Sequence, residues 1–285
     1  MKLSRPNAEI FVPDGLAPEA ALSRTTHLAV AAHPDDLEIM AFDGIKQCFQ
    51  RPGRWFCGVV ATDGAGSPRD DLYKDYTDEA MKQVRRKEQK KAAVVGELGA
   101  LALLDHPSVA AKDPKNRGLV DDLLALLQHA KPQVVYTHNL ADKHDTHAAV
   151  ASRVIAALRE LPQTSRPHKV YGCEVWRDLD WMVDSDKVAF DVSGHESLQA
   201  ALLGVFDSQI CGGKRYDLAT LGRRRAHATY HDSHATDLAT GITFAMDVTP
   251  LVLDASRDLA EFVQEHLDRL ARDVKDRLQR VGLSP

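Results

Sequence analysis

The sequence predicts an α/β protein, a three-layer sandwich in which helices cover both faces of a mostly parallel sheet. Short apolar segments alternate along the chain with longer amphipathic ones, the order that builds parallel sheets through βαβ units. The apolar segments are continuous, as expected for strands that are buried on both faces. The chain has 285 residues, of which 44% are hydrophobic and 27% charged, so a large globular core can form.

The elements of the first half follow from local composition. Residues 27–32 (HLAVAA) and 55–61 (WFCGVVA) are short and apolar, so we expect strands there. Residues 62–73 bring Gly, Ser, Pro and Asp together, which is typical of turns. Residues 78–98 are dense in Lys, Arg, Glu and Ala and predict a long helix, which Gly99 is expected to end. Further helices are expected at 37–50, 119–130 and 148–158, and further strands at 101–104, 133–137 and 169–175.

The last third of the chain is less regular. Residues 188–192, 197–206 and 243–248 predict strand, helix and strand. Residues 259–281 carry apolar side chains at gaps of mostly three and four, which form one stripe along a helix. We favour a helix laid on its own domain; the alternative is a subunit interface and therefore a homo-oligomer.

No repeat, low-complexity tract or convincing linker divides the chain. We therefore expect one domain over 1–285. Residues 1–24, with three prolines, predict a loose arm or an edge covering, and residues 250–285 a C-terminal helical segment.

Composition excludes several classes of protein. Lys and Arg number 36 and Asp and Glu 41, a net charge of -5, whereas nucleic-acid binders usually carry a basic excess. The four cysteines form no Cys-x-x-Cys pair, which disfavours a zinc knuckle or a thioredoxin-type site. No segment has the apolar core of a signal peptide or the apolar length of a membrane span. We therefore expect a cytoplasmic protein with a small-molecule substrate.

A first polar cluster, His33-Pro34-Asp35-Asp36, follows the first predicted strand. Ligands of open α/β sheets bind beyond the carboxyl ends of the strands. His33 offers an imidazole nitrogen and Asp36 a carboxylate oxygen, and both suit zinc. Asp35 is then free to take a proton from water. A turn at Pro34 with acids capping the next helix is the alternative, but it gives His33 no role, so metal binding is slightly favoured.

A second polar cluster runs from His138 to His147, after the predicted strand at 133–137. It holds three histidines and two acids in ten positions. His144 and His147 are three apart and share a face if the helix has begun there, so one can bind a metal while the other faces the substrate. A solvated polar loop is the alternative. Two such clusters at the ends of strands of one sheet make coincidence the weaker interpretation.

These residues resemble the zinc-dependent N-acetylglucosaminyl deacetylase family named after the PIG-L and LmbE proteins. That family has a His-Pro-(Asp/Glu)-Asp segment after its first strand and a downstream His-x-x-His segment. It often has a Thr-x-Gly turn between them, and an Arg-x-Glu on a helix ending in Leu-Gly. The counterparts here are residues 33–36, 144–147, 62–64, 86–88 and 98–99, within a match that covers roughly residues 27–176.

The resemblance implies a Rossmann-like fold, a Zn²⁺ cofactor and hydrolytic removal of an acetyl group from an N-acetylated amino sugar or glycoconjugate. It implies that His33, Asp36 and His147 are the zinc ligands. It further implies that Asp35 is the general base and that His144 holds the oxyanion or acts as an acid.

Four other residues are expected to contact the substrate. The resemblance places Arg86 at the substrate rim, and we expect Asp63 and Asn139 there as well. Trp176 follows a strand at the predicted active edge, where it stacks on a sugar face or belongs to the core.

The chain departs from the family pattern at one position. The family usually has Asp directly before the final His, bonded to the other histidine, and this chain has Thr146 there. An imidazole without a carboxylate partner is less readily held as imidazolium. Asp142 is a candidate substitute partner.

Weaker signals lie in the last third of the chain. His227, His231 and His234 have helical spacing; we favour surface or rim histidines over a second metal site, since no acid has motif spacing nearby. Arg223–Arg225 predicts a solvated face, with recognition of an anionic substituent as the alternative.

Two other functions compete. A non-haem iron enzyme also uses two His and one carboxylate, although usually on a β-barrel. A non-catalytic carbohydrate-binding relative gains weight from Thr146 and loses it from the presence of Asp35.

Overall fold

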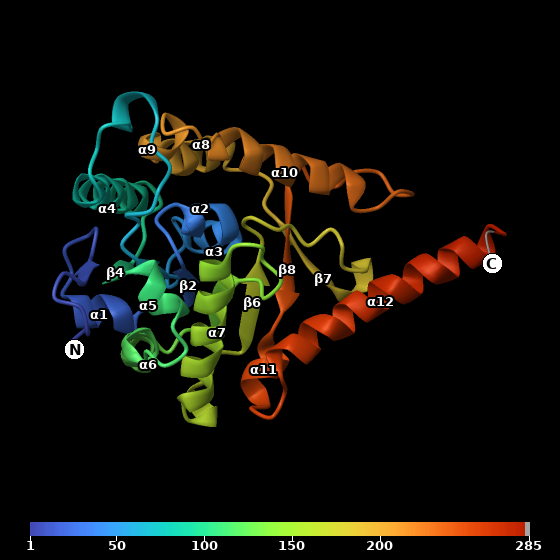
Figure 1. Ribbon diagram of the computed structural model, residues 1–285, viewed down its shortest axis with the longest axis horizontal. Coiled ribbons are helices and arrows are strands. Elements are labelled where there is room, and N and C mark those ends of the chain that lie inside the picture. Colours follow the sequence, from blue (N-terminus) through green and yellow to red (C-terminus); the bar gives the residue numbers. More distant parts are fainter. Residues whose placement is uncertain (283–285) are drawn as a thin grey trace.

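One eight-stranded sheet organises the chain, and the computed structural model describes residues 1–282. Its strands are β1 (Glu9–Phe11), β2 (His27–Ala31), β3 (Phe56–Thr62), β4 (Ala100–His106), β5 (Val134–His138), β6 (Lys169–Cys173), β7 (Lys187–Asp191) and β8 (Ile242–Asp247). They lie in the order β1-β4-β3-β2-β5-β6-β8-β7 (Figure 1). The five strands from β4 to β6 pair in parallel. The pairs β1–β4, β6–β8 and β8–β7 are antiparallel.

Helices cover both faces of this sheet. They are α1 (Pro18–Ser23), α2 (Asp36–Met40), α3 (Phe42–Cys48), α4 (Asp78–Val95), α5 (Ser108–Lys112), α6 (Gly118–Ala130), α7 (Asp145–Glu160), α8 (Glu196–Gly204), α9 (Asp207–Ile210), α10 (Tyr216–Tyr230), α11 (Thr249–Leu253) and α12 (Leu259–Arg280), with short 3-10 turns at Asp71–Tyr73, Gln163–Ser165 and Asp184–Asp186. Leu28 and Val30 of β2 pack on the core under α1, α6 and α7, whereas Ala29 and Ala31 face the core under α2, α3 and α8. The predicted three-layer α/β sandwich is confirmed.

Two elements differ from the sequence-based expectation. The helix predicted at 37–50 is two helices that meet at Ala41, and the side chain of Arg224 donates to the carbonyls of Glu38 and Ile39 at the end of α2. The long helix α4 ends at Val95 and is capped at Gly96, not at Gly99. For residues 1–24 the expected alternatives were a loose arm and an edge covering; β1 pairs with β4 and so covers that edge of the parallel strands.

The order of the parallel strands creates a crevice at one place. The chain passes from β2 outward to β3 and β4, and then returns to β5 on the other side of β2. Such a reversal separates the connections that leave two neighbouring strands at their carboxyl ends, and ligands bind there in open α/β sheets. The segments after β2 and β5 are the two polar clusters that the sequence analysis singled out.

The last helix, α12, runs outward from the body of the molecule (Figure 1). Its buried side chains, Phe262 and His266, lie in its first third. The helix expected to lie on its own domain therefore does so only at its beginning. Within residues 1–282, none of the helices combines the length and the apolar character needed to cross a bilayer.

Candidate active site

Three side chains from the two strand ends converge on one point. His33 follows β2, Asp36 begins α2 and His147 lies in the first turn of α7. The Nδ1 atom of His33 is 3.1 Å from Nε2 of His147 and 3.2 Å from Oδ2 of Asp36. Nε2 of His147 and Oδ2 of Asp36 are 3.3 Å apart. Ligands at about 2.0–2.1 Å from a tetrahedral zinc ion lie roughly 3.3 Å from one another. The three atoms therefore have the spacing of three corners of such a coordination shell.

The turn after β2 shapes this arrangement. The backbone N–H of His33 donates to Oδ2 of Asp36 at 2.8 Å, which closes the turn around Pro34. Asp35 has a left-handed backbone with φ of 91°, an uncommon conformation for a residue with a Cβ. Its N–H donates to Oε1 of Gln89 at 3.0 Å. This backbone turns the two neighbouring carboxylates to different partners.

A buried carboxylate orients His147. Oδ2 of Asp142 lies 3.3 Å from Nδ1 of His147 and places a proton there, so that Nε2 faces Asp36 and His33. Metal-binding histidines are commonly held in this way. Burial lowers the pKa of His147, but Asp36 and Asp142 outweigh burial and raise that pKa to about 9. The cluster thus stabilises a positive charge, which a metal ion can supply in place of the proton.

His138, at the end of β5, is a neighbour that the sequence analysis did not assign. Its Nε2 is 3.5 Å from Oδ2 of Asp36, close enough for Asp36, His138 and His147 to form a second grouping of donor atoms. That nitrogen, however, accepts the N–H of Ala32 at 2.8 Å, so its lone pair is already used. Its ring stacks on His147 with 3.9 Å between centroids. His138 therefore supports the ring of His147; the sequence indicated only its place in the second cluster.

His144 caps the start of α7 beside the three donor atoms. Its Nδ1 accepts the N–H of Thr146 at 3.3 Å, which leaves Nε2 protonated. Burial, together with His147 and His33, lowers its pKa, so the ring is neutral at neutral pH. Asp142 bonds the backbone N–H of His144 and not its ring, so the expectation that Asp142 replaces the missing carboxylate partner is wrong.

Asp35 lies beside the three donor atoms but is not one of them. Its carboxylate pairs with Arg85 at 3.2 Å, and the residue is buried. Burial raises the pKa of Asp35 to about 7; the charge of Arg85 opposes this and that of Asp36 adds to it. A carboxyl with such a pKa can accept and return a proton near neutral pH.

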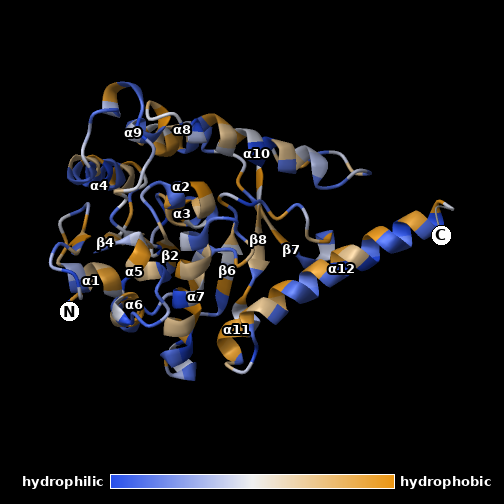
Figure 2. Ribbon diagram, viewed as in Figure 1, coloured by the Kyte–Doolittle hydropathy of each residue, from blue (hydrophilic) through white to orange (hydrophobic). Residues whose placement is uncertain are grey.

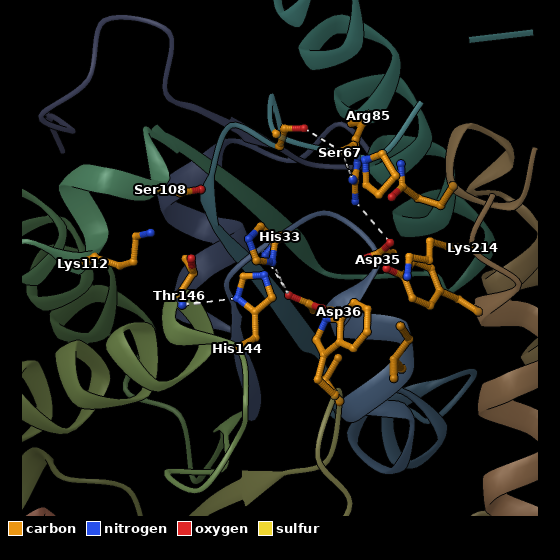
Figure 3. A pocket seen from close by; sticks show the side chains of 18 residues that line it. His33, Asp35, Asp36, Ser67, Arg85, Ser108, Lys112, His144, Thr146 and Lys214 are labelled. Atoms are coloured by element: carbon orange, nitrogen blue, oxygen red, sulfur yellow. Dashed lines mark hydrogen bonds and ion pairs between the residues drawn. The ribbon is translucent and has the colours of Figure 1, made fainter. Parts of the chain in front are cut away.

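These groups lie at a cavity of about 500 Å³ (Figure 3). Of the residues predicted from the sequence, His33, Asp35, Asp36, His144 and Trp176 line it. His147 stands behind them with no exposed side-chain surface.

Three residues predicted to contact the substrate lie elsewhere. Arg86 binds Glu9 and Asp105 and so holds β1, whereas its neighbour Arg85 reaches the cavity. Successive residues on a helix point about 100° apart, so two adjacent arginines reach different places. The sequence motif indicated Arg86, and the structure places Arg85 at the cavity. The others are Asp63, which pairs with Lys82 at 3.0 Å, and Asn139, whose buried amide donates to the carbonyls of Cys173 and Arg177.

The weaker histidine signal has a structural explanation. His227 is buried and stacks on Phe244 with 4.2 Å between centroids, and His231 packs on the same ring. His234 is exposed beyond the end of α10. The rim interpretation is therefore wrong for His227. Within residues 1–282, the donor groupings tight enough for an ion are His33–His144–His147 and Asp36–His138–His147.

The fold recurs in solved structures. A conserved protein from Thermus thermophilus has 20% identity and a TM-score of 0.59, over 81% of this chain and 98% of that chain. A 4-carboxy-2-hydroxymuconate hydratase from Pseudomonas putida has 15% identity and a TM-score of 0.57, over 79% and 95%. An N,N'-diacetylchitobiose deacetylase from Pyrococcus horikoshii has 17% identity and a TM-score of 0.56, over 78% and 83%. At these identities the likeness shows a shared fold.

A comparison with curated proteins gives no match. The profile of the PIG-L family, described as GlcNAc-PI de-N-acetylase, matches residues 28–158. That stretch contains β2 to β5 and both polar clusters, and it confirms the resemblance drawn from the motifs. Over residues 28–158, the chain is therefore similar to the PIG-L family.

Proposed function

We propose that this protein is a metal-dependent hydrolase that removes the acetyl group from an N-acetylated amino sugar or glycoconjugate. The observation that carries the proposal is the spacing of 3.1–3.3 Å among the donor atoms of His33, Asp36 and His147, beside the carboxylate of Asp35, which is in neither tight donor grouping. Two His and one Asp suit Zn²⁺, and zinc sites with three protein ligands keep a position for water or substrate.

A metal ion bound by these residues would contribute to the reaction in two ways. A divalent ion held there would polarise the acetamide carbonyl and lower the pKa of a water molecule. Arg85, at 3.2 Å from Asp35, keeps the proton-accepting carboxylate oriented at the cavity wall.

The remaining steps belong to side chains. Asp35 accepts a proton from a water molecule while the oxygen of that water bonds to the acetamide carbon. The Nε2–H of His144 donates to the carbonyl oxygen as negative charge develops there, an interaction worth roughly 3–4 kcal/mol. The C–N bond then breaks, and Asp35 returns its proton to the departing nitrogen. The products are acetate and a free amine.

Trp176 supplies a surface for the sugar ring. It lines the cavity, and its ring centroid lies 6.3 Å from that of His144. An aromatic face at that distance suits stacking against the apolar face of a pyranose.

The direct test is product analysis with zinc-loaded protein and a panel of N-acetylated sugars. We expect equal amounts of acetate and primary amine. His33→Ala should lose both metal and turnover, while His129→Ala, an exposed histidine on α6, should keep both. A full metal complement in His33→Ala would refute the ligand assignment.

The same experiment separates the two competing functions. Sugar binding with no acetate released would identify a non-catalytic relative. Oxygen consumption by the iron-loaded protein, with no deacetylation by the zinc-loaded one, would identify a non-haem iron enzyme.

A further inference from the structure

Two lysines border the active-site cavity without a carboxylate partner. Lys112 ends α5, and Lys214 lies between α9 and α10; both line the cavity, on opposite sides in Figure 3. Within residues 1–282, the lysines that form ion pairs are Lys82, Lys90, Lys169 and Lys187. The ammonium groups of Lys112 and Lys214 are not among them.

The acids of the cavity wall do not balance these charges. Asp35 pairs with Arg85, and Asp36 lies among the metal-binding nitrogens. The lining residues thus carry three cationic side chains against two carboxylates, before any divalent ion is counted. A neutral substrate would leave this excess of positive charge uncompensated.

Lys214 is also positioned by an aromatic ring. Its Nζ lies 5.0 Å from the ring centroid of Trp176, within the range of a cation–π contact. The backbone N–H of Trp176 in turn donates to Asp142, which orients His147. The ammonium group is therefore held at the cavity wall near the metal-binding side chains.

We propose that the substrate carries an anionic group, a carboxylate or a phosphate, which Lys112 and Lys214 bind while the acetamide lies at His33. This inference rests on the proposed deacetylase function, and it adds the charge of the substrate to it. Charge-assisted hydrogen bonds from both sides of the cavity would fix the orientation of the sugar.

Substrates matched in their acetamide but not in charge test the inference. N-acetylglucosamine is neutral, its 6-phosphate carries a phosphate, and N-acetylmuramic acid carries a carboxylate. We expect kcat/KM at least about tenfold higher for one of the anionic compounds. Lys112→Gln and Lys214→Gln should remove that advantage through KM and leave the neutral substrate nearly unchanged. Lys115→Gln, exposed on the loop after α5, is the matched control.

Equal kcat/KM for neutral and anionic substrates, or variants that affect both alike, would overturn the inference. If no compound is hydrolysed, the deacetylase proposal fails and calorimetric titration decides the charge question. If either anionic compound binds, and its affinity falls at least about tenfold when Lys112→Gln and Lys214→Gln are combined, the two lysines form the anion site. If neither anionic compound binds, the inference is refuted.

A second, independent observation concerns the apolar stripe of α12, defined as Val263, Leu267, Leu270, Val274 and Leu278. Leu267, Val274 and Leu278 are 41%, 45% and 43% exposed. The stripe is centred about 100° around the helix from Phe262 and His266, the buried side chains at the start of the helix. Figure 2 shows apolar residues along the outward part of this helix. At 22 residues the helix is about 33 Å long, so the stripe is larger than scattered surface residues would give.

The charges of α12 are distributed unevenly along its length. The first half, 259–269, has a net charge of −2, and the second half, 270–280, a net charge of +2; the charged residues are Glu261, Glu265, Asp268 and Arg269, then Arg272, Asp273, Lys275, Asp276, Arg277 and Arg280. Two such helices placed antiparallel bring each acidic half against a basic half. Their apolar stripes then cover each other.

We infer that a second copy of this chain covers the stripe, with the two α12 helices antiparallel about a two-fold axis. An isologous contact of this kind is the usual basis of a homodimer. Light scattering of the full-length protein should give a dimer. Val274→Glu with Leu278→Glu should give a monomer that keeps its secondary structure by circular dichroism.

The matched control is Leu238→Glu, a fully exposed leucine away from α12, which should remain dimeric. Lys275→Glu, a charge reversal beside the stripe in the basic half, should also weaken the dimer, and adding Asp268→Lys on the same side in the acidic half should restore it. A monomeric parent protein, or an oligomer that survives both changes in α12, would overturn the inference.

Discussion

The Nδ1 atom of His33 and the Nε2 atom of His147 lie 3.1 Å apart, although 114 positions separate the two residues in the chain. They meet because β2 and β5 are parallel neighbours, so that the segments leaving their carboxyl ends share one edge of the sheet. Two imidazole nitrogens at this distance need a proton or a cation between them, and Asp36 adds a negative charge beside them. This arrangement supports the proposal that a divalent ion binds here.

Asp35 is expected to move protons without holding the metal. Replacing Asp35 by Asn should therefore keep the metal content while kcat falls by roughly 10²–10⁴-fold, the usual contribution of a general base. Elemental analysis and initial rates measure the two quantities. Asp63→Asn, an acid that pairs with Lys82 outside the cavity, is the control. Turnover close to that of the parent in Asp35→Asn would rule out this role.

His144 is expected to stabilise charge as a neutral donor. His144→Gln should keep the metal and lose about 10²–10³-fold in kcat, as expected for one lost oxyanion donor. Because His33, His144 and His147 also form a grouping tight enough for an ion, metal content is the discriminating measurement. Loss of the ion from His144→Gln would make His144 a ligand instead.

Two adjacent arginines are expected to differ in their effects. Arg85→Met should reduce kcat by at least about tenfold, because Asp35 loses the guanidinium that orients it. Arg86→Met should leave kcat nearly unchanged and lower the free energy of unfolding by about 1 kcal/mol, because Glu9 and Asp105 lose their partner. Initial rates and urea unfolding of both variants give the comparison. The reverse pattern would place Arg86 at the substrate.

Asp142 is expected to act on metal affinity through His147. Asp142→Ala removes the acceptor of the Nδ1 proton and should weaken metal binding by roughly 10–100-fold. A competition titration with a chelating dye measures the change. An unaltered dissociation constant would show that the orientation of His147 does not depend on this carboxylate.

His227 is expected to contribute to acid sensitivity. Burial lowers its pKa from 6.5 to about 4, so the unfolded chain takes up the proton before the folded one does. The free energy of unfolding should therefore fall as the pH drops from about 6.5 towards about 4, by roughly 1–3 kcal/mol from this residue. Urea unfolding of His227→Gln should show a smaller loss over that range. Equal losses in both proteins would contradict the assignment.

The local sequence pattern was sufficient to predict most strands of the central sheet. The buried strands at 27–32 and 133–137 are continuous apolar runs, and each ends directly before a polar cluster. Because the carboxyl ends of parallel strands share an edge, His33, Asp36 and His147 were predictable as neighbours from the sequence.

Other features depend on tertiary contacts that no local pattern encodes. His138 lies within the second cluster, yet its role follows from the N–H of Ala32, a contact between strands. The choice between Arg85 and Arg86 depends on the rotation of α4 relative to the sheet. Arg224 is buried at the end of α2 although it belongs to a run of three arginines, which indicates a solvated surface.

The most direct test of the metal site is anomalous diffraction at the zinc edge from crystals of the zinc-loaded protein. We expect one strong peak about 2.0–2.2 Å from Nδ1 of His33, Oδ2 of Asp36 and Nε2 of His147, with Asp35 outside the coordination shell. A peak bound by other side chains, or none at this edge of the sheet, would contradict the account.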